Sequence, residues 1–190
     1  MVLDSDRYET IKKEVANFLE DWEIHKYPIN PFYIFKKVGI PVKTYGELPD
    51  GERQAAFSRS EDAFTKFEGS LIPTVYYNEK KSYCRIRFSL FHELGHIVLW
   101  HSGCDEKKEE YEANFFAGYI IAPIPLVINN CSSLDIEFIS NIFEISYSSA
   151  KVVHDHAVNR ILCGKVCEEY EYRILDLCSI EEEMLMDERN

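Results

Sequence analysis

Two histidines and a glutamate stand close together in the segment Phe91–His96, which reads FHELGH. His92 and His96 are four residues apart, and on a helix such residues project from nearly the same face. Two imidazoles arranged in this way can bind one tetrahedral Zn²⁺ ion. Glu93 then lies where it can reach a zinc-bound water instead of the ion. Because zinc lowers the pKa of that water from about 15.7 towards about 7, a carboxylate can take its proton as the oxygen attacks a polarised carbonyl.

The residues around this segment predict a helix independently of the histidines. The pattern HExxH also arises by chance, in which case both histidines are ordinary core or surface residues. Apolar packing on both flanks favours the chemical interpretation, and so does Gly95, which lets another backbone approach closely. Apolar residues recur at helical spacing from about Tyr83 until before Gly103, at Ile86, Leu90, Phe91, Leu94, Ile97 and Val98.

A catalytic zinc needs a third protein ligand and one open position. The next predicted helix, from about residue 106 to residue 121, offers Glu109, Glu110 and Glu112. Glu110 shares a face with Asn114, whose side chain can bond the second ring nitrogen of a metal-bound histidine. We therefore predict Glu110 as the ligand and keep Glu112, which points roughly opposite, as the alternative. A solvated acidic face is the competing interpretation of any single glutamate here.

The two motifs together resemble those of a known family. The run RIRFSLFHELGH at 85–96 is followed by ExEANxFA at 110–117 and by Ala-Pro at 122–123. This order looks like the ImmA/IrrE family of zinc metallopeptidases, and the resemblance covers roughly residues 25–160. One departure is the stretch Ala-Pro-Ile-Pro at 122–125, where the family usually shows an apolar pair, Met and Pro.

The resemblance implies a zincin-like fold and a set of site residues. It carries the family's metal ligands onto His92, His96 and Glu110 and its catalytic glutamate onto Glu93. Family members cut helix-turn-helix repressors, typically of mobile elements such as phage or of stress responses. The implied function is a zinc endopeptidase that hydrolyses a peptide bond in such a repressor. The alternative is a catalytically silent module of the same fold that controls a transcriptional regulator by association.

The remaining sequence predicts an α+β fold with a mainly helical C-terminal half. A first helix has apolar positions from Ile11 to Trp22, with Asp4 or Ser5 as its N-cap. A second helix begins at Pro31, with Asn30 as its cap, and ends near Gly39. Two further helices are expected at 134–143 and 146–162.

Residues 40–78 predict a small, mostly antiparallel sheet packed on the zinc helix. Short β-branched and aromatic runs at 41–45, 55–58 and 71–77 are separated by Gly and Pro-Asp-Gly turn signals. We expect the edge strand to lie within 71–77 and to accept an extended substrate by strand addition. Residues 1–165 are predicted to form one domain, and residues 166–190 an acidic extension.

The formal net charge of −12 argues against a nucleic-acid partner. Nucleic-acid binding draws most of its affinity from Lys and Arg side chains that neutralise phosphates. Residues 140–162 could form a helix-turn-helix, but Lys151 and Arg160 are its only basic residues. We therefore expect a protein partner and no direct contact with nucleic acid.

The N-terminal residues lack the basic-then-apolar order of a signal peptide, and the apolar runs are too short to cross a bilayer. We expect a cytoplasmic protein that does not bind membranes. The six cysteines should then be mostly buried thiols. Cys163, Cys167 and Cys178 offer too few ligands for a structural zinc knuckle.

Overall fold

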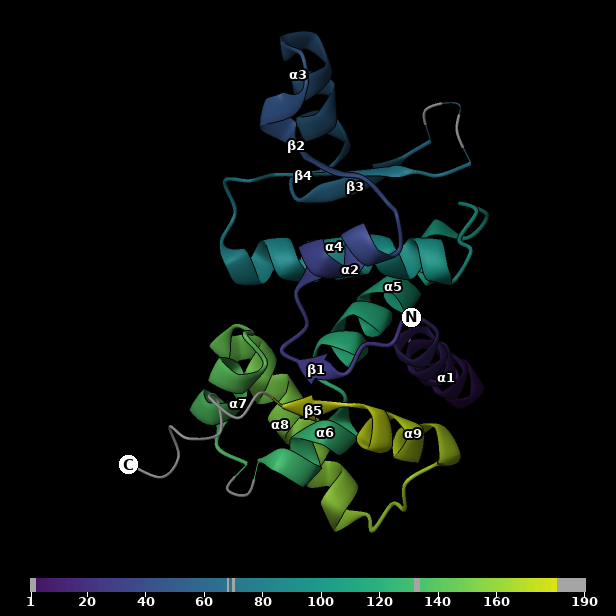
Figure 1. The fold of residues 1–190 in the computed structure, drawn as a ribbon, viewed down its shortest axis with the longest axis vertical. Coiled ribbons are helices and arrows are strands. Elements are labelled where there is room, and N and C mark those ends of the chain that lie inside the picture. Colours follow the sequence, from purple (N-terminus) through teal and green to yellow (C-terminus); the bar gives the residue numbers. More distant parts are fainter. Residues whose placement is uncertain (1–2, 68, 70, 132–133, 181–190) are drawn as a thin grey trace. The chain divides into compact units, whose positions relative to one another are not determined.

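The computed structural model describes residues 3–67, 69, 71–131 and 134–180, and the chain divides into two compact units (Figure 1). The first unit contains Asn30–Ala117 together with the N-terminal residues to Leu3. The second contains Asp4–Ile29 and the described residues from Gly118 to Ile180. Helices and small sheets occur in both units, and the second unit is mainly helical, so the predicted α+β fold with a helical C-terminal half is confirmed.

The first unit is built around a three-stranded sheet. Its strand order is β2-β4-β3, with β2 parallel and β3 antiparallel to the central strand β4. The sheet is therefore mixed, whereas we expected a mostly antiparallel one. The elements of this unit are α2 (Pro31–Lys37), β2 (Val42–Thr44), the 3-10 helix η1 (Tyr45–Glu47), α3 (Asp50–Arg59), β3 (Ala63–Lys66), β4 (Thr74–Tyr77), α4 (Tyr83–Val98) and most of α5 (Glu106–Ile121).

Two details of the predicted sheet are wrong. The run at 55–58 belongs to helix α3, which begins after Pro49 and has Asp50 and Glu52 in its first turn, where acids favour the helix dipole. A four-residue apolar run does not distinguish a strand from a helix segment. The strand within 71–77 is β4, which is paired on both sides and so is not an edge. Among the described residues, β2 and β3 form the two edges.

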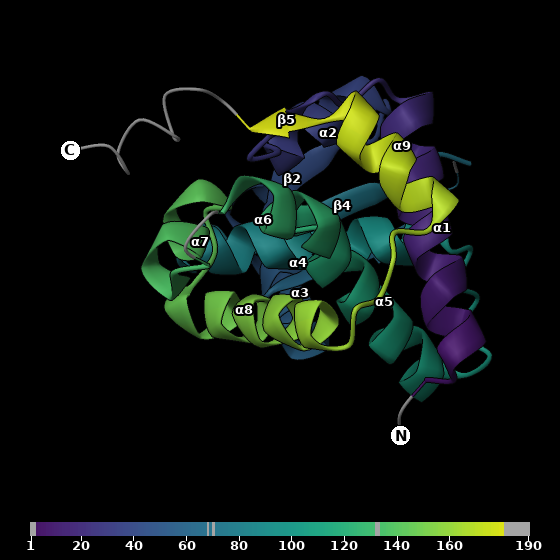
Figure 2. The same cartoon turned by 90° about the horizontal axis from the view of Figure 1, so that it is seen from below.

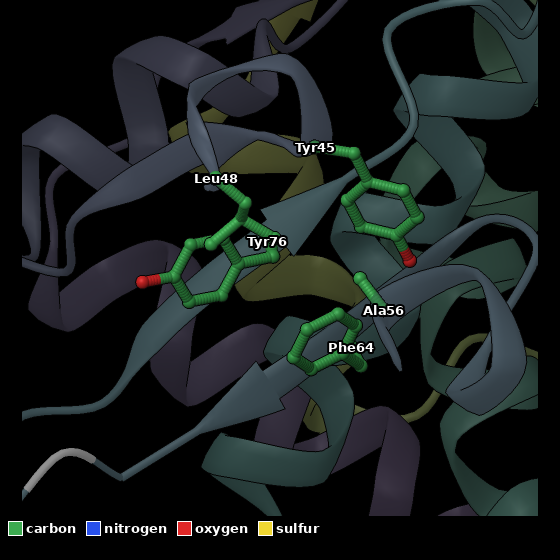
Figure 3. Close-up of a cluster of buried hydrophobic side chains, with 5 residues drawn as sticks. All are labelled: Tyr45, Leu48, Ala56, Phe64 and Tyr76. Atoms are coloured by element: carbon green, nitrogen blue, oxygen red, sulfur yellow. The ribbon is translucent and has the colours of Figure 1, made fainter. Parts of the chain in front are cut away.

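Aromatic side chains fill the space between the sheet and α3 (Figure 3). The rings of Phe64 on β3 and Tyr76 on β4 stack with their centroids 5.4 Å apart, and the ring of Tyr45 lies 5.7 Å from that of Phe64. Leu48 and Ala56 complete this buried cluster. Helix α4 packs against β3 and β4, and Figure 1 shows the sheet between α3 and α4. This packing fixes β3 beside the helix that carries the two histidines.

The second unit confirms the helices predicted at the N-terminus and around 134–162. Asp4 caps the first helix by accepting a hydrogen bond from the Arg7 backbone N–H at 2.7 Å. The strands β1 and β5 pair in parallel, and α9 packs along α1 (Figure 2). The elements are α1 (Ser5–Asp21), β1 (Lys26–Tyr27), the end of α5, α6 (Ile124–Asn130), α7 (Ile136–Ile142), α8 (Tyr147–Leu162), α9 (Glu169–Leu177) and β5 (Ser179–Ile180).

Two helices of this unit were not predicted. Pro123 and Pro125 end α5 at Ile121 as expected, but a new helix, α6, begins at once, because the first N–H groups of a helix need no intrahelical partner and a proline is tolerated there. The residues assigned to an acidic extension form α9 and β5 up to Ile180. The rest of that extension, 181–190, lies outside the described residues, and the assignment of one domain to residues 1–165 stays a prediction.

One stretch, residues 106–130, is long and apolar enough to cross a membrane by length and composition alone. It consists of α5 and α6, and 67% of its most apolar window is buried inside the protein. A buried core helix of a soluble protein has the same composition. Burial therefore accounts for the hydropathy of this stretch.

A partly buried network around Glu9 of α1 ties this helix to α9 and to the loop before it. Tyr170 donates a hydrogen bond to Glu9, and the ammonium groups of Lys12 and Lys165 lie 2.9 Å and 3.1 Å from its carboxylate. Burial by itself would raise the pKa of Glu9, but these hydrogen bonds outweigh it and lower the pKa to about 2. The ionised carboxylate is therefore part of the folded state.

We expect Glu9→Gln to lower the free energy of unfolding by about 1 kcal/mol at pH 7, the usual size of a partly exposed charge-assisted hydrogen bond. The folded-state pKa lies below the ordinary value of 4.5, so the stabilisation is fully present above about pH 4.5 and is lost as the pH falls towards about 2. Urea unfolding of both proteins between pH 2 and pH 7 measures the difference. Glu14→Gln, the same change elsewhere on α1, is the control. An equal difference at every pH would contradict the role of the carboxylate.

Candidate metal centre

Three side chains of the first unit converge at the junction of α4 and α5. The Nε2 atoms of His92 and His96 lie 3.0 Å apart. The Glu110 carboxylate reaches both, with one oxygen 3.3 Å from His92 Nε2 and the other 3.3 Å from His96 Nε2. The structure thus brings together the three residues predicted to bind zinc, and within the described part of the chain they form a group able to hold a metal ion. That they bind zinc stays a prediction.

The spacing of these donor atoms fits a tetrahedral zinc ion. Ligand atoms about 2.0–2.1 Å from a tetrahedral Zn²⁺ lie about 3.3 Å from one another, and the observed separations are 3.0–3.3 Å. Burial, followed by the nearby charge of His96, lowers the pKa of His92. This favours the neutral imidazole, which is the form that binds a metal.

Asn114 on α5 lies beside His92, in the contact that the helical spacing predicts. The Asn114 Oδ1 atom is 3.2 Å from His92 Nδ1. If Nδ1 carries the proton and donates to this oxygen, Nε2 keeps its lone pair and faces Glu110. The amide therefore selects the tautomer of His92 that a metal requires.

His101 and Glu112 make a second set of contacts, on the other side of His96. His101 Nδ1 lies 2.9 Å from His96 Nδ1, and His101 Nε2 lies 3.0 Å from a Glu112 carboxylate oxygen. Glu112, the alternative ligand, is thus held by His101, whereas Glu110 lies at the imidazole pair. His101 was not predicted as a site residue, because it follows the end of the helix, where the four-residue spacing no longer applies.

Glu93, the predicted general base, lies in the same cleft as the two histidines. Its side chain is buried, and one carboxylate oxygen accepts a 2.7 Å hydrogen bond from the Thr65 hydroxyl on β3. Burial raises the pKa of Glu93, and the Thr65 hydrogen bond partly opposes this rise. A carboxylate with a raised pKa is suited to accept a proton and pass it on near neutral pH.

A cleft of about 830 Å³ runs over these residues. Its walls include Thr65 on β3 and the large apolar side chains of Leu71 and Trp100, which are 98% and 89% exposed. Exposed apolar side chains at the rim of a cleft are suited to contact a bound polypeptide. The space is sufficient for several residues of an extended chain.

The cysteines differ from the prediction of mostly buried thiols. All six are free, but only Cys131 and Cys178 are buried, while Cys104 and Cys163 are exposed. All of the cysteines except Cys84 lie in loops or directly beyond helix ends, where a side chain can remain accessible to solvent. Within the described residues, the cysteines do not join the candidate metal group.

Comparison with known proteins identifies one family. A family model described as the IrrE N-terminal-like domain, of peptidase family M78, matches residues 48–152. The match covers more than half of the chain and includes every residue of the candidate metal centre. A search of curated proteins finds no significant match.

Gly95 lies at a close approach between α4 and α5. A Cβ atom at this position would lie 3.1 Å from a ring carbon of Phe116 and 3.2 Å from the backbone Cα of Ala113. The second neighbour is main chain and cannot rotate away. Any side chain at residue 95 therefore pushes against the helix that carries Glu110.

We expect Gly95→Ala to lower the free energy of unfolding by up to about 2 kcal/mol, because overpacking costs about 1–3 kcal/mol and is only partly offset by the gain of about 1 kcal/mol in helix propensity. Gly118→Ala on α5 is the matched control, since a Cβ there meets nothing within 4 Å. Gly118→Ala should stabilise the protein by up to about 1 kcal/mol. Urea unfolding measures both changes, and equal stabilisation by the two substitutions would disprove the close contact.

Proposed function

The chain belongs to the peptidase family of IrrE N-terminal-like domains, the ImmA/IrrE family, and we propose that it is a zinc-dependent endopeptidase. The observation that carries this proposal is the convergence of His92, His96 and Glu110 beside the buried carboxylate of Glu93, all on the wall of one cleft. These residues would hold the ion through two imidazole nitrogens and one carboxylate, which leaves one position open.

When bound at this centre, Zn²⁺ supplies a Lewis acid that polarises a peptide carbonyl and acidifies water. Glu93 then acts as the general base. Thr65 engages one oxygen of its carboxylate, so the other oxygen takes the proton from the attacking water. The same oxygen gives that proton to the leaving amine nitrogen when the peptide bond breaks. Asn114 keeps the ring of His92 in place while this happens.

We propose β3 as the strand that receives the substrate. Asn78 N–H donates to the Asp62 carbonyl at 2.8 Å, which places residues 62, 64 and 66 in the hydrogen-bonded pairs with β4. Thr65 then directs its backbone N–H and C=O away from β4, towards the edge. Since the Thr65 side chain touches Glu93, a strand added at this edge passes over the general base.

Side chains of the same unit cover part of this edge. The guanidinium of Arg59 donates to the Thr65 carbonyl at 3.1 Å, and the Ser60 hydroxyl accepts from the Ala63 N–H at 3.3 Å. A substrate strand that bonds to these groups displaces both side chains. Arg59 is exposed and Ser60 is half-buried, so the guanidinium can move into solvent at low cost and the hydroxyl needs only to rotate.

The substrate that we propose is a helix-turn-helix repressor in the cytoplasm. DNA-binding proteins are basic, and this chain has a net charge of −12, so long-range electrostatics favour their encounter and disfavour binding of nucleic acid itself. The order of motifs shared with the family supports the same class of substrate.

Glu93→Gln should abolish cleavage while zinc binding persists. General base catalysis contributes about 10²–10⁴-fold to rate, so we expect a loss of at least about 100-fold in kcat. The assay incubates zinc-loaded protein with a helix-turn-helix repressor and looks for one discrete cut by mass spectrometry. Chelation should stop the cleavage, and added Zn²⁺ should restore it.

Two variants complete this test. Glu110→Gln should lose both zinc and activity, whereas Glu137→Gln, an exposed position on α7, should keep both. Full activity of Glu93→Gln would refute the assignment of the base. A wild-type protein that binds zinc and the repressor without cutting it would favour a binding module over an enzyme.

Thr65→Pro tests the role of the β3 edge. Proline removes the outward N–H but leaves the ladder to β4, so KM should rise by about tenfold, the equivalent of about 1.4 kcal/mol of lost hydrogen bonding. Thr65→Val removes the hydroxyl as well but keeps the N–H, so it serves as the control for the lost contact with Glu93. Peptide hydrolysis kinetics measure both variants. Equal KM values for the proline and valine variants would contradict strand addition at β3.

A further inference from the structure

His101 and Glu112 form a buried pair behind the candidate metal centre. Their side chains are 6% and 3% exposed, and their facing atoms lie 3.0 Å apart. Neither residue belongs to the candidate metal-binding group of His92, His96 and Glu110. A histidine and a carboxylate withdrawn from water cost free energy unless they bond to each other or to a third group. Here the third group is His96.

The side chains of Glu112, His101 and His96 form a chain of two hydrogen bonds. The carboxylate of Glu112 determines which nitrogen atoms donate in it. A carboxylate only accepts hydrogen bonds, so His101 Nε2 carries the proton that it donates to Glu112. With its proton on Nε2, His101 offers the lone pair of Nδ1, which can accept from His96 Nδ1 at 2.9 Å. His96 therefore carries its proton on Nδ1 and keeps a lone pair on Nε2, the atom that faces His92 and Glu110.

The opposite arrangement, with the protons on His101 Nδ1 and His96 Nε2, is unfavourable at both ends of this chain of hydrogen bonds. It would set the lone pair of His101 Nε2 against a carboxylate oxygen. It would also place a proton on His96 Nε2, where a metal must bind. The ammonium group of Lys108, 3.9 Å from the second oxygen of Glu112, favours the ionised carboxylate and so the first arrangement.

The backbone at the end of α4 holds His101 in position. The His101 N–H donates to the His96 carbonyl at 3.0 Å, and the Trp100 N–H donates to the Ile97 carbonyl at 3.2 Å, which together make a Schellman motif. Trp100 occupies the left-handed position with φ of 55°, where glycine is the usual residue. This conformation costs about 1–2 kcal/mol for a residue with a Cβ. The turn folds His101 back over His96 despite that cost.

We propose that His101 and Glu112 are positioning residues, which fix the tautomer and orientation of His96 so that its Nε2 is presented to the metal. The proposal rests on the proposed function only in that it requires zinc at this centre. His101 touches neither the ion nor the substrate in this role. Its effect reaches the metal through His96, as Asn114 acts through His92.

Zinc affinity of the full chain, measured by competition with a chromophoric chelator, tests this proposal. His101→Leu should weaken zinc binding by about 10- to 100-fold, the usual effect of removing the partner of a ligand histidine. His101→Gln should restore affinity to within about threefold of wild type, because its amide oxygen can accept from His96 while its amide nitrogen donates to Glu112. His156→Leu, the same loss of a histidine at an exposed position of α8, should change nothing.

A second measurement, on the wild-type protein, tests the proposal if His101→Leu does not fold. In the zinc-loaded wild type, long-range ¹H–¹⁵N correlation of the imidazoles should show His96 protonated at Nδ1 and His101 protonated at Nε2 alone. A proton on His101 Nδ1 would overturn the proposal. Rescue by glutamine together with these tautomers supports it.

The outcomes separate this proposal from the proposed function. Equal zinc affinity of wild type and His101→Leu would overturn the positioning role, even if the protein cleaves its substrate. Weakened affinity that glutamine rescues would support the role, even if no substrate is cut and the peptidase assignment fails. A wild-type chain that takes up no zinc would overturn both.

Discussion

The close approach of α4 and α5 at Gly95 is the constraint on which the candidate site depends. A Cβ at that position would lie 3.2 Å from the backbone of Ala113, so the two helices approach too closely there for a side chain to fit without a shift. At this distance the carboxylate of Glu110 spans the short gap to both imidazoles, and Asn114, one turn further along α5, reaches the ring of His92. A single glycine thus sets the distance between the two halves of a metal site.

Four contacts between polar side chains define the state of the groups at this site. The hydroxyl of Thr65 bonds to Glu93, the amide of Asn114 bonds to His92, and His101 connects His96 to Glu112. Removal from water would otherwise penalise the buried side chains of Glu93, His101 and Glu112. The same contacts that compensate for burial also orient the groups, so stability and preorganisation have a common origin here.

The sequence was most informative where function depends on spacing within one helix. The four-residue interval between His92 and His96 and the face shared by Glu110 and Asn114 are local properties, and the structure contains both arrangements. The spacing of residue types along the chain could not predict how strands distant in sequence pair with one another. β4 is central because β2 and β3 pair with its two sides, and this pairing could not be predicted from residues 71–77 alone. His101 was missed because a left-handed turn, unexpected at a tryptophan, brings it back to the helix.

The covering of β3 by Arg59 and Ser60 has a consequence for the behaviour of the protein in a crowded solution. An uncovered sheet edge offers its backbone to any extended chain, including another copy of the same molecule, and this is a common route to aggregation. A guanidinium on the Thr65 carbonyl and a charged Lys66 at the end of the strand discourage such self-association. Only an extended chain whose hydrogen bonds to β3 are strong enough to displace the side chains of Arg59 and Ser60 can then pair with this edge.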